Sequence, residues 1–271
     1  MTQLSLDRVA IIGAGKMGIT IISSLLERTN IGPQQIIATR KHAAPLEELA
    51  TDKGIHTTTD NREAVKGADV VLLGVKPQTI TDVLDEIGPD LKNNQIVVSI
   101  AAGVTSAQMD ERLRGAIPVV RAMPNTPSLI GAGMTAVCGG EHASDDHLET
   151  TRQIFDVMGR AITLDEKYFD AFTGLGASGP AFVYIIIESL AEGGVKMGLP
   201  RNVAIEVAAQ ACLGASKMVL DTDAHPALLK DAVTTPAGCT MDGIITLEEG
   251  GIRVTLIKTV VEAARRAGEL G

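Results

Sequence analysis

Short runs of apolar, often β-branched residues alternate with helix-like stretches along the first part of the chain. The runs are almost continuously apolar instead of alternating with polar positions, which is typical of strands covered on both faces. Strands that alternate with helices predict an α/β fold with a parallel, doubly wound sheet. The strands are expected at Val9–Ile12, Gln35–Ala38, Ile55–Thr58, Val70–Leu73, Ile96–Ile100, Val119–Arg121, Met134–Cys138 and Ala161–Leu164.

The pattern changes after about residue 164, where alanine-rich helical periodicity replaces the strand signals. Two domains are therefore predicted, an N-terminal sheet domain (residues 1–164) and an all-helical C-terminal domain (residues 165–271). Phe182–Ile187 has the composition of a strand, but its apolar pattern continues past strand length and predicts a helix. Pro200 is expected as the first residue of another helix. Prolines and glycines between residues 124 and 139 predict irregular turns and a mixed direction of the last strands.

Composition and charge exclude several classes of protein. With 45% hydrophobic residues, 21% charged residues and 28 glycines among 271, the chain is too apolar to be disordered. Aromatic residues make up 2% and the net charge is −9, so the chain lacks both the stacking platforms and the cationic surface of a nucleic-acid binder. An anionic ligand must therefore be held locally, by backbone amides or a few placed cations.

The cysteines and the N-terminus bear on location. Cys138, Cys212 and Cys239 are far apart and form no Cys-x-x-Cys pair, which indicates a reducing compartment and predicts no metal site. The first residues lack the features of a secretory signal, and no apolar run approaches membrane-spanning length. The expectation is a cytoplasmic protein with no nucleic-acid or membrane partner.

A glycine-rich loop follows the first predicted strand. It reads Gly13-Ala14-Gly15-Lys16-Met17-Gly18, between Ile12 at the strand end and an apolar helical pattern. In Rossmann-type domains the first glycine of G-x-G-x-x-G permits a tight turn, the second admits the pyrophosphate, and the third lets helix and strand pack closely. The phosphates then face a helix N-terminus. Residues 1–164 are therefore predicted to be a dinucleotide-binding, Rossmann-type domain.

The end of the second strand indicates which dinucleotide is bound. An NAD enzyme usually has Asp or Glu there, but this chain has Thr39, Arg40 and Lys41. A hydroxyl and two cations suit the 2′-phosphate of NADP. Three more loops at strand ends are expected to border the cofactor: Gly74-Val75-Lys76-Pro77, Ile100-Ala101-Ala102-Gly103 and Met123-Pro124-Asn125-Thr126-Pro127.

A second segment with candidate chemistry lies in the helical half, at Leu229–Thr240. Hydroxyls, a proline and small residues precede a helix start there. Exposed amides and the positive end of a helix dipole suit a small carboxylate. As a bare pattern, the same residues also describe a well-capped helix.

Taken together, these motifs resemble the pyrroline-5-carboxylate reductases over essentially the whole sequence. The resemblance implies a reductase that passes a hydride from NADPH, with NADH as a weaker substitute, to the C=N carbon of 1-pyrroline-5-carboxylate. The product is L-proline, and the reaction is the last step of proline biosynthesis. Besides the glycine loop, the matching segments are Val75-Lys76-Pro77, Ala101–Val104, Asn125-Thr126-Pro127, Gly176–Ala181, Gly193–Pro200, Leu229–Thr240 and Glu248–Gly251.

The resemblance also implies site residues and an assembly. Thr240 would be the catalytic position, with its hydroxyl near the ring nitrogen. The substrate carboxylate would be held by the amides of Gly238, Cys239 and Thr240 and by the Thr235 hydroxyl. Asn61 matches a cofactor position near the adenine ribose, and Glu166 matches a position close to the substrate. The family forms homodimers through the helical domain and often rings of five such dimers.

Two positions depart from the family pattern. Its common Pro-Gly-Gly-Thr core reads Pro236-Ala237-Gly238-Cys239 here, and Thr240 follows. Ala237 is expected to adopt an ordinary backbone conformation, since alanine lacks the freedom of glycine. Cys239 is expected to be a small neutral filler, with a reactive thiol beside a helix N-terminus as the alternative.

Two other functions are left open by the residues. The fold also serves reductases of other cyclic imines and hydroxyacid dehydrogenases, but the latter need a mid-helix catalytic lysine, whereas Lys196 stands at a glycine-rich helix end. A sensor that only binds NADPH would retain the nucleotide fold. Such a sensor would have no use for the segment Thr235–Thr240.

Overall fold

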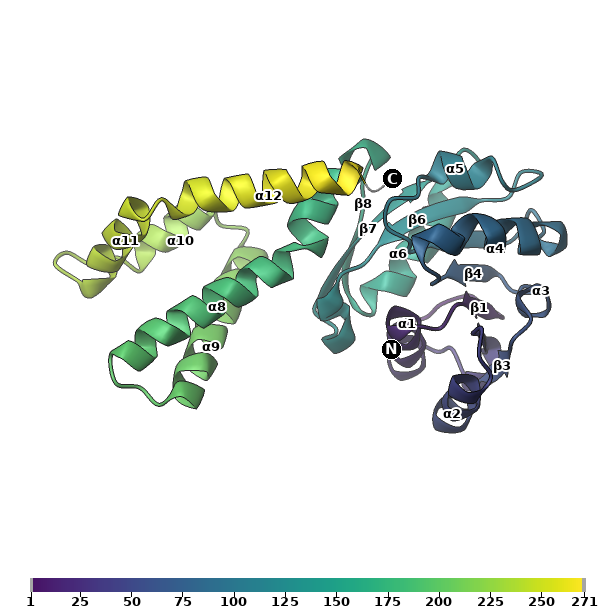
Figure 1. Cartoon of the computed structure of the whole chain (residues 1–271), viewed down its shortest axis with the longest axis horizontal. Helices are drawn as coiled ribbons and strands as arrows, with labels where there is room; N and C mark the ends of the chain where they lie inside the picture. The colour runs from purple at the N-terminus through teal and green to yellow at the C-terminus, as the bar shows by residue number, and fades with distance from the viewer. Residues whose placement is uncertain (1, 270–271) are drawn as a thin grey trace. The chain divides into compact units, whose positions relative to one another are not determined.

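The computed structural model describes residues 2–269 and shows an α/β part followed by helices (Figure 1). By their contacts, the residues up to Ala177 together with those from Ala263 form one compact unit, and Ser178–Glu262 form a second. The predicted domain boundary between residues 164 and 165 stays a prediction, because this division reflects compactness alone.

The first unit is built on an eight-stranded sheet with the order β3-β2-β1-β4-β5-β6-β7-β8. Neighbouring strands pair in parallel, except β6 and β7, which are antiparallel. The predicted doubly wound sheet and the mixed direction of its last strands are therefore confirmed. The strands are β1 (Val9–Ile12), β2 (Ile36–Thr39), β3 (His56–Thr58), β4 (Val70–Leu73), β5 (Ile96–Ser99), β6 (Val119–Met123), β7 (Gly133–Gly139) and β8 (Gly159–Thr163).

Helices cover both faces of this sheet, which explains the continuous apolar runs. In β1, Val9 and Ile11 belong to one buried cluster, and Ala10 and Ile12 belong to another. Helix α1 supplies side chains to the first cluster and α4 to the second. The helices of this region are α1 (Lys16–Arg28), α2 (Ala44–Lys53), α3 (Asn61–Ala64), α4 (Ile80–Ile87), α5 (Ser106–Asp110), α6 (Asp145–Asp156) and α7 (Phe169–Phe172), the last followed by a π-helical turn at Thr173–Ala177.

The rest of the described chain is helical, as expected. Its helices are α8 (Gly179–Lys196), α9 (Arg201–Thr222), α10 (Pro226–Ala232), α11 (Cys239–Glu249) and α12 (Ile252–Gly268). The helix expected at Phe182–Ile187 is confirmed as part of α8. Pro200 is not the first helical residue of α9 but its N-cap, because its ψ of 139° is extended and the helix begins at Arg201.

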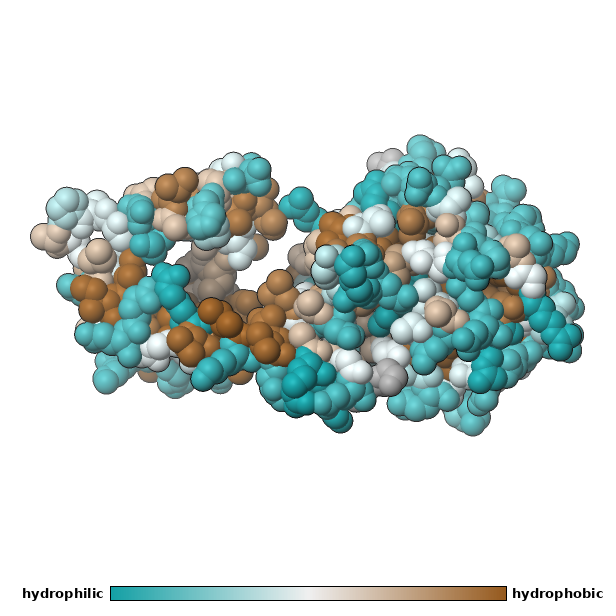
Figure 2. All heavy atoms as spheres, turned by 90° about the horizontal axis from the view of Figure 1, so that it is seen from above, coloured by the Kyte–Doolittle hydropathy of each residue, from teal (hydrophilic) through white to brown (hydrophobic). Residues whose placement is uncertain are grey.

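Helices α8 and α9 bury little apolar surface within the second unit. They pack through Ala191, Ala204 and Ala208, while large side chains such as Tyr184, Ile205 and Leu213 remain exposed. Figure 2 shows apolar side chains gathered on this part of the surface.

By length and composition alone, the helical stretches Glu166–Lys196 and Arg201–Thr222 could cross a membrane. The expectation that no apolar run reaches this length is therefore wrong. Alanine, glycine and isolated polar residues interrupt the large apolar side chains, so the sequence does not read as one run, although its average is apolar.

Candidate active site

The glycine loop forms the tight turn between β1 and α1. Gly13 has a φ of +83°, and a Cβ there would lie 2.5 Å from Cγ1 of Val75. A Cβ on Gly74 would lie 2.7 Å from the carbonyl oxygen of Gly13. The loops that follow β1 and β4 therefore touch through positions that admit no side chain.

Gly15 differs from these glycines. A Cβ there would meet no atom within 4 Å, so the backbone is open to a ligand, as a pyrophosphate requires. Gly15 is also the N-cap of α1, which among the described residues has no side-chain cap and no acidic residue in its first turn. The first amides of α1 and its positive dipole end are thus available to an anion. Gly18 lets α1 approach β1 closely, with a hypothetical Cβ 3.3 Å from Cγ2 of Ile11.

Thr39, at the end of β2, ties the glycine loop to the residue that begins α3. The amides of Gly13 and Ala14 donate to the Thr39 carbonyl at 3.2 and 2.8 Å. The buried Thr39 hydroxyl accepts from the Gly13 amide at 3.2 Å and donates to Oδ1 of Asn61 at 2.7 Å. This geometry does not fit the hydroxyl as a phosphate ligand, because its proton is already used.

The two cations predicted to bind a 2′-phosphate are the next residues after Thr39 in the sequence. Nε of Arg40 donates to the Ala14 carbonyl, which holds the guanidinium against the glycine loop. Lys41 is exposed. Since Thr39 is engaged in the fold, Arg40 and Lys41 are the residues of this segment that fit a phosphate group.

The loop after β4 lies beside the glycine loop, and the loop after β5 follows at the next strand of the same sheet edge. Ile12, Leu73 and Ser99 are in register at the carboxyl ends of β1, β4 and β5. In doubly wound sheets ligands bind at this edge. The predicted cofactor segments Gly74–Pro77 and Ile100–Ala102 are therefore brought together with the glycine loop.

The side chain of Asn125 forms hydrogen bonds to other parts of the protein. It is 8% exposed, its Nδ2 donates to the Gly176 carbonyl at 2.8 Å, and its Oδ1 accepts from the Met134 amide at 2.9 Å. Both ends of the amide thus connect the start of β7 to the π-helical turn. A cofactor contact by Asn125 stays a prediction, and its side-chain amide does not support it.

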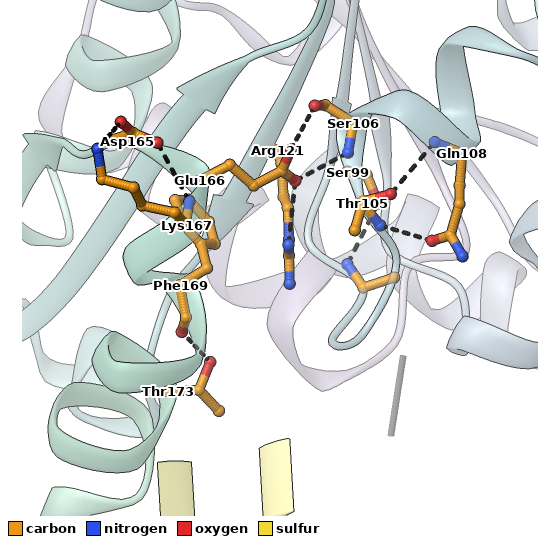
Figure 3. A network of polar contacts seen from close by, with 11 residues as sticks. Ser99, Thr105, Ser106, Gln108, Arg121, Asp165, Glu166, Lys167, Phe169 and Thr173 are labelled. Carbon is orange, nitrogen blue, oxygen red and sulfur yellow. Dashed lines mark hydrogen bonds and ion pairs between the residues drawn. The ribbon is translucent and has the colours of Figure 1, made fainter. Parts of the chain in front are cut away.

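Glu166 lies in a network of charged and polar groups (Figure 3). Its carboxylate accepts from the Ser106 amide at 2.8 Å, from the Ser106 hydroxyl at 2.6 Å, and from Nη1 of Arg121 at 3.0 Å. The Arg121 side chain is 5% exposed, and its guanidinium carbon lies 4.7 Å from the centre of the Phe169 ring. Glu166 thereby holds the start of α5 and strand β6 to the segment that leads into α7.

The Glu166 carboxylate is held in its charged form. Burial alone would raise the pKa of Glu166, but the hydrogen bonds from Ser106 and Arg121 outweigh burial and lower this pKa below its ordinary value. A contact of Glu166 with substrate stays a prediction. Sequence reasoning missed Arg121 and Ser106 as its partners, although one arginine inside an apolar strand run was a signal for a buried partner.

The substrate-binding residues predicted in the helical half lie together in the second unit. Gly238 is the N-cap of α11, and its amide donates to the Thr235 carbonyl at 2.9 Å. A Cβ on Gly238 would lie 2.5 Å from Oγ1 of Thr235, so the hydroxyl sits directly against this glycine. Cys239 and Thr240 follow as the exposed first residues of α11. No described side chain caps this helix, which leaves its first amides to an anion.

Ala237 corrects an expectation. Its φ is +59°, in the left-handed region, and not the ordinary conformation expected for alanine. The turn that returns the Gly238 amide to the Thr235 carbonyl requires this conformation, and the family pattern has glycine at this position. A left-handed non-glycine residue costs about 1–2 kcal/mol.

Replacing Ala237 by glycine is therefore expected to stabilise the protein by about 0.5–1 kcal/mol, the relieved strain less the greater chain entropy of unfolded glycine. Thermal and denaturant unfolding measure this change. Ala211→Gly, inside α9, is the control and should destabilise the protein by a similar amount. A loss of stability in both variants would show that residue 237 is not strained.

Among the described residues, the cysteines and acidic groups form neither a disulfide nor a metal site. All three cysteines are free, and burial raises the pKa of the Cys138 thiol to about 12. Within residues 2–269, no group of three or more His, Cys, Asp or Glu side chains is placed to hold a metal ion.

Comparisons with known proteins agree with this geometry. Residues 166–270 match the family model of pyrroline-5-carboxylate reductase dimerisation, and residues 8–103 match that of NADP oxidoreductase, coenzyme F420-dependent. The pyrroline-5-carboxylate reductase of Methanosarcina acetivorans is 39% identical over 265 residues, which cover 98% of both chains. That of Glycine max is 41% identical over 260 residues, 96% of this chain and 94% of the relative.

Solved structures give the same result. A pyrroline-5-carboxylate reductase from Coxiella burnetii superposes with a TM-score of 0.93 at 34% identity and covers 98% of both chains. The Plasmodium falciparum pyrroline carboxylate reductase with NADP bound superposes with a TM-score of 0.86 at 26% identity over 100% of both chains. With this identity over nearly its whole length, the chain belongs to the pyrroline-5-carboxylate reductase family.

Proposed function

We infer that this chain is an NADPH-dependent oxidoreductase that reduces 1-pyrroline-5-carboxylate to L-proline, the last step of proline biosynthesis. The observation that carries this conclusion is the 39% identity to a curated pyrroline-5-carboxylate reductase over 98% of both chains. A glycine loop open at Gly15 and an uncapped helix start at Gly238 are the two anion sites that such a reaction needs.

The reaction requires mainly that the protein position the cofactor and the substrate relative to each other. A protonated cyclic imine accepts a hydride at its C=N carbon, and NADPH, when bound, supplies that hydride. The amides of Gly238, Cys239 and Thr240 and the Thr235 hydroxyl hold the substrate carboxylate, which fixes the face presented to the hydride. The Thr240 hydroxyl orients the ring nitrogen. This hydroxyl need not protonate the ring nitrogen, because threonine is a weak acid and water can supply the proton.

The cofactor is held at the carboxyl edge of the sheet. The glycine loop, Ile12 to Gly18, binds the pyrophosphate through the start of α1, and Arg40 and Lys41 bind the 2′-phosphate. Asn61 is at the ribose end. The segments Gly74–Pro77 and Ile100–Ala102 border the remainder of the cofactor.

Reversing the charge of Arg40 tests the 2′-phosphate assignment. Arg40→Asp is expected to raise the KM for NADPH at least tenfold and the KM for NADH less than about threefold, because only NADPH carries the extra phosphate. Steady-state kinetics with both cofactors measure the two constants. Arg160→Asp, an exposed position on edge strand β8, is the matched control and should change neither. Equal effects of Arg40→Asp on both cofactors would refute the assignment.

Removing the Thr240 hydroxyl tests the substrate site. Thr240→Ala is expected to lower kcat with 1-pyrroline-5-carboxylate about tenfold or more, while the Kd for NADPH stays within about twofold. Thr246→Ala is the control on the same helix, since that hydroxyl only donates to the Asp242 carbonyl. Unchanged kinetics of Thr240→Ala would remove this residue from the site.

The chain acts as a homodimer through its helical segment. The exposed apolar faces of α8 and α9 belong to residues 166–270, which match the dimerisation model, so a partner subunit accounts for them without a membrane. A ring of five dimers and a cytoplasmic location are further parts of the proposal. The family resemblance supports the ring, and three free cysteines support a reducing compartment.

A further inference from the structure

A chain of hydrogen bonds connects the glycine loop to a carboxylate on a different helix. The Gly13 amide donates to the Thr39 hydroxyl, and this hydroxyl donates to Oδ1 of Asn61 at 2.7 Å. Nδ2 of Asn61 then donates to Oε2 of Glu86 at 2.9 Å. Glu86 lies in the last turn of α4, so a residue far from the glycine loop in sequence ends the chain.

Glu86 determines the direction of these hydrogen bonds. An ionised carboxylate only accepts, so the Asn61 amide must turn its Nδ2 toward Glu86 and its Oδ1 toward Thr39. The Thr39 hydroxyl then has to donate to Asn61, which leaves its lone pairs for the Gly13 amide. Glu86 therefore fixes how the glycine loop and the end of β2 are joined to the start of α3.

The charge of Glu86 is not cancelled by a direct partner. Glu86 is exposed and forms no ion pair with any residue in the described part of the chain. Arg62 interacts electrostatically with Glu86, but the Arg62 guanidinium donates its hydrogen bond to Asp90, at 2.5 Å. The carboxylate thus faces Asn61 with no ion-pair partner among the described residues.

The position of this charge matters because of Thr39. The last residue of the second strand is where a dinucleotide-binding sheet meets the 2′ position of the adenosine ribose. NAD sites place their carboxylate on that strand end, which here carries cations instead. Glu86 introduces a carboxylate to the same region from α4, with the amide of Asn61 between it and Thr39.

We propose that Glu86 is a specificity-determining residue for the cofactor, whose carboxylate, fixed by Asn61, opposes a 2′-phosphate and limits the preference for NADPH over NADH that Arg40 and Lys41 create. This inference rests on the proposed function in that it assumes an adenosine cofactor at the end of β2. In this proposal Arg40 and Lys41, which follow β2, attract the 2′-phosphate, and the carboxylate of Glu86 on α4 repels it.

The test uses the variant Glu86→Gln and two probes that differ only in the 2′-phosphate, adenosine 2′,5′-bisphosphate and AMP. Glutamine retains an oxygen that accepts from Asn61, so the fold is kept while the charge is lost. Calorimetry at low ionic strength should show about two- to fourfold tighter binding of the bisphosphate and no change for AMP. The gain should shrink as salt is added.

Glu27→Gln is the matched control, because it removes a glutamate charge from the last turn of α1, at the end of that helix opposite the glycine loop. It should leave both affinities unchanged. In the enzyme assay, the ratio of kcat/KM for NADPH to that for NADH should rise by the same factor in Glu86→Gln only.

Three results would overturn the inference: no change with the bisphosphate, an equal change for both probes, or the same gain in Glu27→Gln. Failure of the proposed function would look different. The unmodified protein would then bind neither bisphosphate nor NADP, or would bind them and show no turnover with 1-pyrroline-5-carboxylate.

Discussion

Glu166→Leu is expected to lower the free energy of unfolding by about 3–5 kcal/mol, because it leaves the buried charge of Arg121 without its partner. The Arg121 side chain, 5% exposed, would keep its charge without a carboxylate, and its Nε already has no partner among the described residues. The amide and hydroxyl of Ser106 would lose their acceptor as well. Denaturant unfolding at a fixed protein concentration measures the change, since dimerisation makes stability depend on concentration.

The control for this prediction is Glu149→Leu, which breaks an exposed pair with Arg152 on α6. It should cost less than about 1 kcal/mol. A similar small cost for Glu166→Leu would show that the pair with Arg121 does not hold the fold.

The pH dependence gives an independent check. Because hydrogen bonds lower the pKa of Glu166 in the folded protein, its contribution is complete above the unfolded value near 4.3 and is lost as the pH falls through the lower folded pKa. Glu166→Gln should therefore lose less stability than the unmodified protein over this acidic range. If the unfolding free energy of both proteins changed with pH by the same slope, the charge assigned to Glu166 would be contradicted.

Gly15→Val is expected to weaken NADP binding about a hundredfold or more while changing the free energy of unfolding by less than about 1 kcal/mol. A Cβ at Gly15 meets no protein atom within 4 Å, and its φ of −73° is open to any residue. The added methyl groups would instead occupy the space through which a pyrophosphate reaches the first amides of α1. Calorimetry with NADP and thermal unfolding without ligand separate the two effects.

Gly74→Ala is the contrasting variant. Its Cβ would lie 2.7 Å from the Gly13 carbonyl oxygen, so this single methyl group should reduce stability. If Gly15→Val binds NADP normally, the glycine loop is not the pyrophosphate site. If Gly15→Val unfolds instead, the loop serves packing alone.

Features that depend on local chemistry could be predicted from the sequence. Strands β1 and β4 have the expected bounds, because residues buried on both faces of a sheet leave a continuous apolar run. The glycine loop was recognisable because a tight turn, an open backbone and a close helix contact each require glycine at a fixed spacing. The start of α11 was less clear from the sequence, because the same pattern also describes a well-capped helix, whereas no described side chain caps it in the structure.

Features that depend on distant contacts could not be predicted. Arg121 and Glu166 are 45 positions apart, and only the sheet order brings them together. The links from Thr39 to Asn61 and from Asn61 to Glu86 need the positions of α3 and α4. Ala237 adopts a left-handed conformation because the surrounding turn imposes it, against the preference of the residue itself.

The central claim is tested most directly by following NADPH oxidation in the near ultraviolet when 1-pyrroline-5-carboxylate is added, with NADH in parallel and L-proline quantified as the product. We predict turnover, one proline formed for each NADPH oxidised, and a higher kcat/KM with NADPH than with NADH. Binding of NADPH without any turnover, or turnover without proline, would contradict the account and would instead favour a sensor or a reductase of another cyclic imine.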